Sequence, residues 1–272
     1  MVLEKNTNRK QKTGNGKSIR AKINNKSRFF QAKLAFPSKN PNKVIECTKC
    51  GMTYSNQSHE DIMMHDKFHD LRINGRKWST NWGQQVYLVE DSVDGLLSTP
   101  LLSQDSCFTN DERIVMVRPN HSAEVNATLD IMTLVNNELN APHDENSFWS
   151  QENGTGKAFI YVKNGKAVGA VTIEMLEKDR GRWMIYKNKV IVQQSRPQFI
   201  LGISRIWVCK SQRLNGIATK LLNAARQNTI FGKIVDKQFI AWSQPSDNGG
   251  KMALKYNSVR HNSGEILIPC YI

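Results

Sequence analysis

Apolar and polar positions follow regular periods from Arg113 onward, and this part of the chain predicts most of the regular structure. Three apolar runs are typical of strands: residues 114–117, 157–163 and 166–176. The dipeptide Asn164-Gly165 between the second and third runs predicts a tight hairpin turn. Residues 123–139 carry apolar side chains at helical spacing, which predicts an amphipathic helix between the first two strands.

Further along, the pattern predicts a strand, a short loop, a helix and a second strand. Residues 200–208 are dominated by β-branched and aromatic side chains, which favour strands. Residues 219–228 place Leu221 and Leu222 on one face of a helix. Residues 238–242 are again apolar and predict the next strand. Strands and helices mixed in this way indicate a domain of the α/β or α+β class.

Three other segments differ in composition. Residues 1–43 are rich in Asn, Lys, Ser and Gly without an apolar period, and we expect them to be disordered. Residues 72–89 contain Trp78 and Trp82 and predict an ordered connection. Residues 90–112 hold six acids and neither Lys nor Arg, a composition typical of a linker.

The chain carries a formal net charge of +14, and most of the excess lies in residues 1–43. These residues hold twelve Lys or Arg and one acid, whereas the rest of the chain holds 26 basic and 23 acidic side chains. A basic segment favours nucleic acids, because binding releases their counterions, or it serves nuclear import. A solubilising tail without a specific partner is the alternative.

Composition disfavours three other classes of protein. No segment approaches the roughly 18 consecutive apolar residues that a membrane-spanning helix needs. The first thirty residues also lack the apolar core of a secretory signal. Five Cys in 272 residues are too few for a disulfide scaffold, which favours a reduced intracellular compartment.

Residues 47–69 carry the spacing of a zinc site, C-x2-C-x14-H-x3-H. Cys47 and Cys50 suit the knuckle of a hairpin, and His65 and His69 lie one turn apart on a helix face. Four such ligands close a tetrahedral shell and predict a structural Zn²⁺ site. The gap is slightly longer than the common twelve residues, and His59 is a rival ligand.

The loop between the strand at 200–208 and the following helix reads R-x-x-G-x-A over residues 213–218. Unpaired amides at the start of a helix attract anions, and the helix dipole adds to this attraction. Gly216 and Ala218 keep bulk away, so that a pyrophosphate can approach the backbone between Arg213 and Thr219. The P-loop and dinucleotide motifs are both absent.

This loop resembles the acetyl-CoA-binding motif of the GNAT acetyltransferase superfamily. Residues 202–208, Gly-Ile-Ser-Arg-Ile-Trp-Val, and residues 242–245, Trp-Ser-Gln-Pro, more narrowly resemble the establishment-of-cohesion N-acetyltransferases, close to the budding-yeast members. The resemblance covers residues 44–272 apart from the linker. It implies a mixed, splayed central sheet flanked by helices, preceded by a small ββα C2H2 zinc finger. We therefore expect a basic disordered tail (1–43), a zinc finger (44–75), a lead-out with an acidic linker (76–112) and a GNAT domain (113–272).

The resemblance also implies a function. Members of this family are nuclear, chromatin-associated enzymes that use acetyl-CoA to acetylate lysines on the ATPase head of a cohesin SMC subunit during S phase. It implies association with the replication sliding clamp (PCNA), for which the residues near Gln31 offer a weak motif, and the basic tail offers contact with DNA. The alternatives are a zinc-finger chromatin adaptor with an inactive GNAT-like domain, and a GNAT enzyme for another nuclear protein.

The resemblance assigns residues to three cofactor segments. The strand beside the pantetheine corresponds to Ile206, Trp207 and Val208. The pyrophosphate loop corresponds to Leu214, Asn215, Gly216, Ile217, Ala218 and Thr219. The segment near the reactive end of the cofactor corresponds to Ser246, Asp247 and Asn248.

The general base is not evident from the sequence. Many GNAT enzymes carry a Glu on the strand at 199–208, which here has no carboxylate, and Gln244 stands where vertebrate relatives have an acid. We expect Asp247 to act as base or lysine anchor with support from Ser204. Glu174 or a water is the alternative base, and Asp247 as a turn residue and Ser204 as a buried hydroxyl are the structural alternatives.

Strand alternation makes a prediction for Arg205. It places Arg205 and Trp207 on one face of the sheet and Ser204 and Ile206 on the other. A buried Arg in this position needs a partner, and we expect a carboxylate that the sequence does not identify.

Overall fold

The computed structural model describes residues 44–89, 111–141, 148–151 and 154–272. These residues belong to one compact unit, Asn42–Ile272. The predictions for the basic tail, for Gln31 and for most of the acidic linker lie outside the described residues. Within the described residues, no helix has both the length and the apolar character that a membrane crossing requires.

The first part is the predicted ββα unit. Strands β1 (Val44–Glu46) and β2 (Thr53–Ser55) pair antiparallel and are followed by α1 (His59–Asn74). Ser58 caps the start of α1 with its hydroxyl, and Gly75 ends the helix with φ of 85°. The motif read from the Cys and His spacing therefore folds as predicted.

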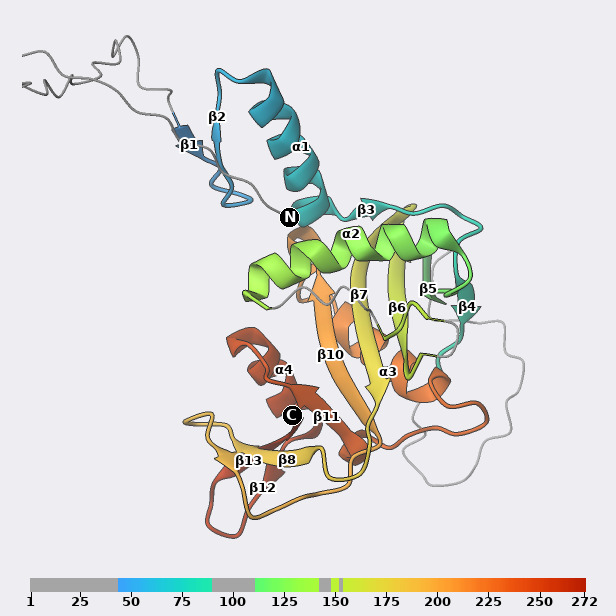
Figure 1. The fold of residues 1–272 in the computed structure, drawn as a ribbon, viewed down its shortest axis with the longest axis vertical. Helices are drawn as coiled ribbons and strands as arrows, with labels where there is room; N and C mark the ends of the chain where they lie inside the picture. The colour runs from blue at the N-terminus through green and yellow to red at the C-terminus, as the bar shows by residue number, and fades with distance from the viewer. Residues whose placement is uncertain (1–43, 90–110, 142–147, 152–153) are drawn as a thin grey trace, which may run out of the picture. The chain divides into compact units, whose positions relative to one another are not determined.

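A mixed sheet forms the centre of the remaining structure (Figure 1). In the described part of the chain it has eleven strands: β3 (Arg76–Lys77), β4 (Gln84–Val86), β5 (Glu112–Met116), β6 (Gly156–Lys163), β7 (Lys166–Met175), β8 (Gly181–Ile185), β9 (Ile191–Val192), β10 (Leu201–Val208), β11 (Ile240–Ser243), β12 (Val259–Arg260) and β13 (Ile266–Tyr271). The order is β4-β5-β6-β7-β10-β11-β13-β8-β9, with β3 on β7 and β12 on β13. The pairs β10–β11 and β11–β13 are parallel, and the other pairs are antiparallel.

The predicted hairpin joins β6 to β7. Asn164 and Gly165 have φ of 50° and 68°, the left-handed conformation that this tight turn requires at both positions. The predicted strands at 114–117, 157–163, 166–176 and 200–208 correspond to β5, β6, β7 and β10, so the class expected from the apolar pattern is confirmed.

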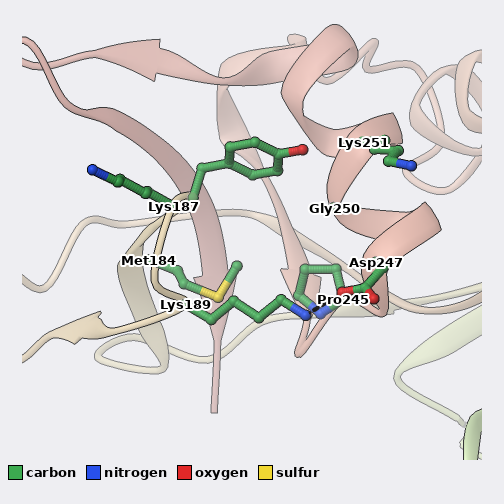
Figure 2. A pocket seen from close by; sticks show the side chains of 8 residues that line it. Met184, Lys187, Lys189, Pro245, Asp247, Gly250 and Lys251 are labelled. Atoms are coloured by element: carbon green, nitrogen blue, oxygen red, sulfur yellow. Dashed lines mark hydrogen bonds and ion pairs between the residues drawn. The ribbon is translucent and has the colours of Figure 1, made fainter.

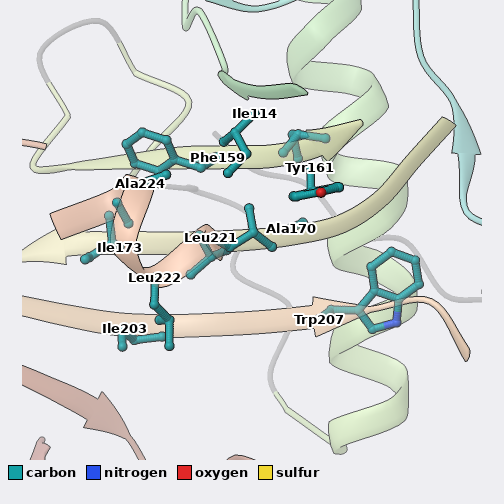
Figure 3. Packing of buried hydrophobic residues seen from close by; sticks show 14 of the residues in the cluster. Ile114, Phe159, Tyr161, Ala170, Ile173, Ile203, Trp207, Leu221, Leu222 and Ala224 are labelled. Carbon is teal, nitrogen blue, oxygen red and sulfur yellow. The ribbon is translucent and has the colours of Figure 1, made fainter. Parts of the chain in front are cut away.

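Helices cover both faces of the sheet. Helix α2 (Ser122–Leu139) lies on one face and α3 (Ile217–Asn228) on the other (Figures 1 and 3). The structure also contains α4 (Asp247–Asn257) and the 3-10 turns η1 (Lys210–Gln212) and η2 (Lys237–Phe239). The prediction of a strand from residue 238 is wrong at its start, because η2 occupies 237–239 and β11 begins at Ile240.

The core lies between the sheet and its helices (Figure 3). Large side chains from both layers are fully buried there, among them Ile114, Phe159, Ile131 and Leu221. Gly169 on β7 sets the approach of α3, because a Cβ there would lie 3.0 Å from side-chain atoms of Ile217 and of Leu221. The missing side chain lets the first turn of α3 pack directly on β7.

Candidate active site and zinc site

The four predicted zinc ligands come together in the finger. One ligand atom each from Cys47, Cys50, His65 and His69 lies within 4.8 Å of the others. The knuckle is held by two backbone hydrogen bonds, from the Gly51 amide to the Cys47 carbonyl at 2.7 Å and from the Cys47 amide to the Met52 carbonyl at 2.9 Å. The two histidines project from adjacent turns of α1.

The donor set fits a structural zinc ion. Within the described residues, the buried Nε2 of His65 has no hydrogen-bond partner, as a metal-binding nitrogen requires. The backbone amide of Cys50 and then His65 lower the pKa of the Cys47 thiol to about 5, which favours the thiolate that binds metal. His59, the rival ligand, is exposed at the first position of α1 and lies outside this cluster.

The predicted strand–loop–helix is present between β10 and α3. Leu214 and Gly216 have φ of 67° and 74°, and Gly216 is the N-cap of α3 without a side-chain hydrogen bond to the helix. The amides of the first helical turn have no partner within the helix. A Cβ on Gly216 would meet no described atom within 4 Å, so an anion has open access to these amides.

Strand β10 presents an open backbone edge beyond Ile203. It pairs with β7 through Val208, but among the described residues it pairs with β11 only from Leu201 to Ile203. The Cys209 amide donates to Val168 on β7 at 2.9 Å. Alternation therefore turns the peptide groups of Trp207 toward β7 and those of Ile206 and Val208 toward the open edge. Ile206 thus offers both its amide and its carbonyl, and Val208 offers its amide, since the Val208 carbonyl accepts from Arg213 Nε at 2.9 Å.

A bulge marks the point where β10 leaves β11. The register of β10 on β7 shifts between Ile203 and Arg205, which places Ser204 at the irregularity. Ser204 is half-buried. Arg205 donates from Nε to Asn136 Oδ1 on α2 at 2.8 Å and from Nη1 to the Ser204 carbonyl at 2.9 Å. The prediction of a carboxylate partner for Arg205 is wrong, because its guanidinium binds the side-chain amide oxygen of Asn136 and the backbone carbonyl of Ser204 instead.

Asp247 is the first residue of α4, so its alternative reading as a turn residue is wrong. Ser246 is the N-cap and accepts from the Gly249 amide at 3.3 Å. The side chain of Asp247 is 83% exposed and pairs with Lys189. The Lys189 ammonium holds the pKa of the Asp247 carboxyl below its ordinary value. Asn248, like Ser246, is exposed.

A pocket of about 480 Å³ lies where α4 begins (Figure 2). It is lined by uncharged and charged residues in equal number: Met184, Tyr186, Pro245 and Gly250, with Lys187, Lys189, Asp247 and Lys251. The Lys189 side chain extends across it to Asp247. The pocket therefore already holds one ammonium against a carboxylate.

Topology brings Ser204 and Asp247 to the same end of the sheet. Because β10 and β11 are parallel, the residues after Ile203 and after Trp242 leave the paired region at the same edge. Ser204 follows directly on β10, and Asp247 follows β11 after one short connection. Parallel sheets place ligand sites at such carboxyl ends.

Glu174, the alternative base, lies on β7 opposite Gly202. Its carboxylate accepts from the Tyr271 hydroxyl at 2.7 Å and from Arg180 Nη1 at 2.8 Å. Burial and then the nearby Glu174 charge raise the pKa of the Tyr271 hydroxyl. Gln244 is exposed, and its side chain is an amide that cannot accept the proton.

The last turn of α2 holds two polar residues that were not predicted from the sequence. Asn136 there binds Arg205 beside the bulge, and Glu138 pairs with Arg72 and Arg213. One signal was available, since an acid in the last turn of a helix opposes the helix dipole and needs cationic partners.

Comparison with protein families gives three matches. Residues 197–265 match the family model of the ESCO1/2 acetyl-transferase, and residues 31–71 match the zinc-finger of acetyl-transferase ESCO. Residues 127–229 match the acetyltransferase (GNAT) family. The finger match contains all four clustered ligands, and the GNAT match contains the cofactor loop.

Full-length relatives give the same result. The chain is 50% identical over 261 residues to N-acetyltransferase ECO1 of Candida glabrata, covering 93% of this chain and 98% of that protein. It is 45% identical over 273 residues to N-acetyltransferase ECO1 of Saccharomyces cerevisiae, covering 92% of this chain and 97% of that one. A solved structure of the xEco2 acetyltransferase domain bound to a K105-CoA conjugate is 25% identical, with a TM-score of 0.47, over 54% of this chain and 88% of that one. The two yeast relatives match nearly end to end.

Proposed function

The chain belongs to the ECO1/ESCO family of acetyl-CoA-dependent N-acetyltransferases, and on this premise we propose that it acetylates lysines on the ATPase head of a cohesin SMC subunit during S phase, thereby establishing sister-chromatid cohesion. One observation carries the catalytic part of this proposal. The open edge of β10 leads directly into a helix N-terminus with unpaired amides.

We assign coenzyme A to this edge and loop. The peptide groups of Ile206 and Val208 bind the pantetheine as an added strand would, and the amides from Leu214 to Thr219 bind the diphosphate. Ser246 and Asn248 lie at the start of α4, near the reactive end. When bound, acetyl-CoA supplies the acetyl group as a thioester.

The chemistry requires a neutral lysine amine. A lysine with a pKa near 10.4 is neutral in about one molecule in 2,500 at pH 7, which costs about 4.6 kcal/mol. We assign Asp247 to hold the incoming ammonium, since its carboxylate already holds the ammonium of Lys189. A carboxyl whose pKa is lowered is a weak proton acceptor, which favours the anchoring role over that of base.

The proton must then leave the lysine. Ser204 at the bulge supports the amine as a polar contact, and a backbone amide of the open edge polarises the carbonyl of the thioester. Glu174 is the alternative acceptor, since it lies two residues from the Thr172 that pairs with Arg205 at the bulge. A water is the remaining acceptor.

The finger and the tail support a nuclear, chromatin-bound enzyme. Zn²⁺ on Cys47, Cys50, His65 and His69 stabilises the finger. The basic residues 1–43 serve nuclear import or DNA contact, and Gln31 belongs to a segment that contacts the sliding clamp. We retain the division into tail (1–43), finger (44–75), lead-out and linker (76–112) and GNAT domain (113–272).

Mass spectrometry of cohesin incubated with the purified chain and acetyl-CoA tests the substrate. We expect acetyl-lysine on the SMC ATPase head, and none when acetyl-CoA is omitted. Acetylation of other nuclear proteins in place of the head would contradict the cohesin assignment and leave the acetyltransferase assignment intact.

A further inference from the structure

The last turn of α2 holds a half-buried acid in an unfavourable position. Glu138 is one residue before the end of α2, where the partial negative charge of the helix C-terminus repels a carboxylate. Its side chain is only 15% exposed. Such a group requires cationic partners, and the structure supplies two from different elements.

The first partner is Arg72 in the last turn of the finger helix. Its Nε lies 2.8 Å from Glu138 Oε1, an ion pair without the alignment of a hydrogen bond. Its Nη1 donates to the carbonyl of Cys50 at 2.6 Å. Arg72 therefore links a zinc ligand's own peptide group to α2.

The second partner is Arg213, which opens the cofactor loop. Its Nη2 lies 3.6 Å from Glu138 Oε2, and its Nε donates to the Val208 carbonyl at 2.9 Å. Arg213 thus spans from the open edge of β10 to α2. A separate hydrogen bond also joins the two parts, from Lys210 Nζ to the Lys49 carbonyl of the knuckle at 2.8 Å.

We propose that Glu138 is a positioning residue that couples Zn²⁺ binding by the finger to coenzyme A binding by the loop. A knuckle closed on zinc fixes the Cys50 carbonyl and hence Arg72. Arg72 then fixes the Glu138 carboxylate, which holds Arg213 and the loop that follows. This inference rests on the proposed coenzyme A site and adds the residue that sets its affinity.

Coupling between two ligands is reciprocal. Zinc should tighten coenzyme A binding, and coenzyme A should tighten zinc binding by the same factor. We expect about five-fold, the lower end of typical coupling between sites, because Arg213 is 41% exposed.

Calorimetric titration of the full chain with coenzyme A, zinc-loaded and after chelation, tests the proposal. In the wild type, chelation should raise the Kd about five-fold. In Glu138→Gln, the zinc-loaded protein should bind coenzyme A as weakly as the chelated wild type does. Chelation of this variant should change the Kd for coenzyme A less than about two-fold. The matched control is Asp130→Asn, which removes the Arg76 ion pair on the same helix and should retain the full zinc effect.

A second readout excludes a merely structural role. Chelator competition should show zinc bound about five-fold more tightly with saturating coenzyme A than without it in the wild type, whereas in Glu138→Gln coenzyme A should leave the zinc affinity unchanged. An unchanged zinc effect in Glu138→Gln, or the same loss in Asp130→Asn, would overturn the proposal. Absence of coenzyme A binding in every form would instead refute the proposed function.

Discussion

Among single residues, the Lys189–Asp247 pair bears most directly on substrate binding. Asp247→Asn should raise KM for the lysine substrate about three-fold, the size expected of an exposed ion pair. KM for acetyl-CoA should not change. The opposite change, Lys189→Gln, removes the internal ammonium and should lower KM for the substrate. Steady-state kinetics of both variants measure this, and equal shifts in the same direction would refute an anchoring role.

The pH profile separates an anchor from a base. The pKa of Asp247 is lowered, so its carboxylate is ionised throughout the neutral range and protonates only in acid. Between pH 6 and 9 the rate should rise as the substrate lysine loses its proton, in the wild type and in Asp247→Asn alike. A fall in kcat of about 100-fold or more in Asp247→Asn at every pH in this range would instead make Asp247 the general base.

Gly216 tests the phosphate loop at one position. Its φ of 74° is one that side chains rarely adopt, and a side chain there would occupy the open space at the start of α3. Gly216→Val should weaken coenzyme A binding at least about ten-fold, since steric strain of about 1–2 kcal/mol adds to loss of access. Calorimetry measures the affinity for coenzyme A, and circular dichroism shows whether α3 is intact. An unchanged affinity would exclude the loop as the phosphate-binding site.

Residue chemistry was partly predictable from the sequence. The zinc ligands follow from spacing, because each knuckle and helix turn is local. The partner of Arg205 does not, since Asn136 lies on a helix 69 residues earlier in the chain. The ion pairs of Glu138 could not be predicted either, because Arg72 and Arg213 are both far from it in sequence.

Among the elements, the contact of α3 with β7 positions the cofactor loop. Gly169→Val would place methyl groups against Ile217 and Leu221, which already lie 3.0 Å from a Cβ. We expect a loss of about 1–3 kcal/mol in the free energy of unfolding and weaker coenzyme A binding, because α3 must move. Denaturant unfolding and calorimetry measure the two effects. Val168→Ala, at the neighbouring buried position, controls for lost stability alone, since it should leave coenzyme A affinity unchanged.

Local elements were predictable, and long-range ones were not. The β6–β7 hairpin follows from Asn164-Gly165, because a two-residue turn fixes its own register. Helix α4 carries Gly249 and Gly250, which favour turns, and depends on its Ser246 cap and on buried Ala253. Strands β8 and β13 pair across about eighty residues, and no local sequence pattern predicts that pairing.

At the level of the whole molecule, the finger and the sheet form one unit through ion pairs. Asp70 on α1 binds Lys166 on β7, in addition to the Arg72–Glu138 pair. Zinc analysis of the purified chain should find about one ion per molecule, and Cys50→Ala should lose it together with the helicity of α1. A metal-free chain with an intact α1 would contradict the assigned role of zinc.

The most direct test concerns the diphosphate. Calorimetric titration of the full chain should show 4′-phosphopantetheine bound at least about 10-fold more tightly than pantetheine, which differs from it only in lacking the phosphate, since one charge-assisted hydrogen bond to an amide supplies that difference. Equal affinities for the two, or no binding of coenzyme A, would contradict the account of the loop from Arg213 to Thr219.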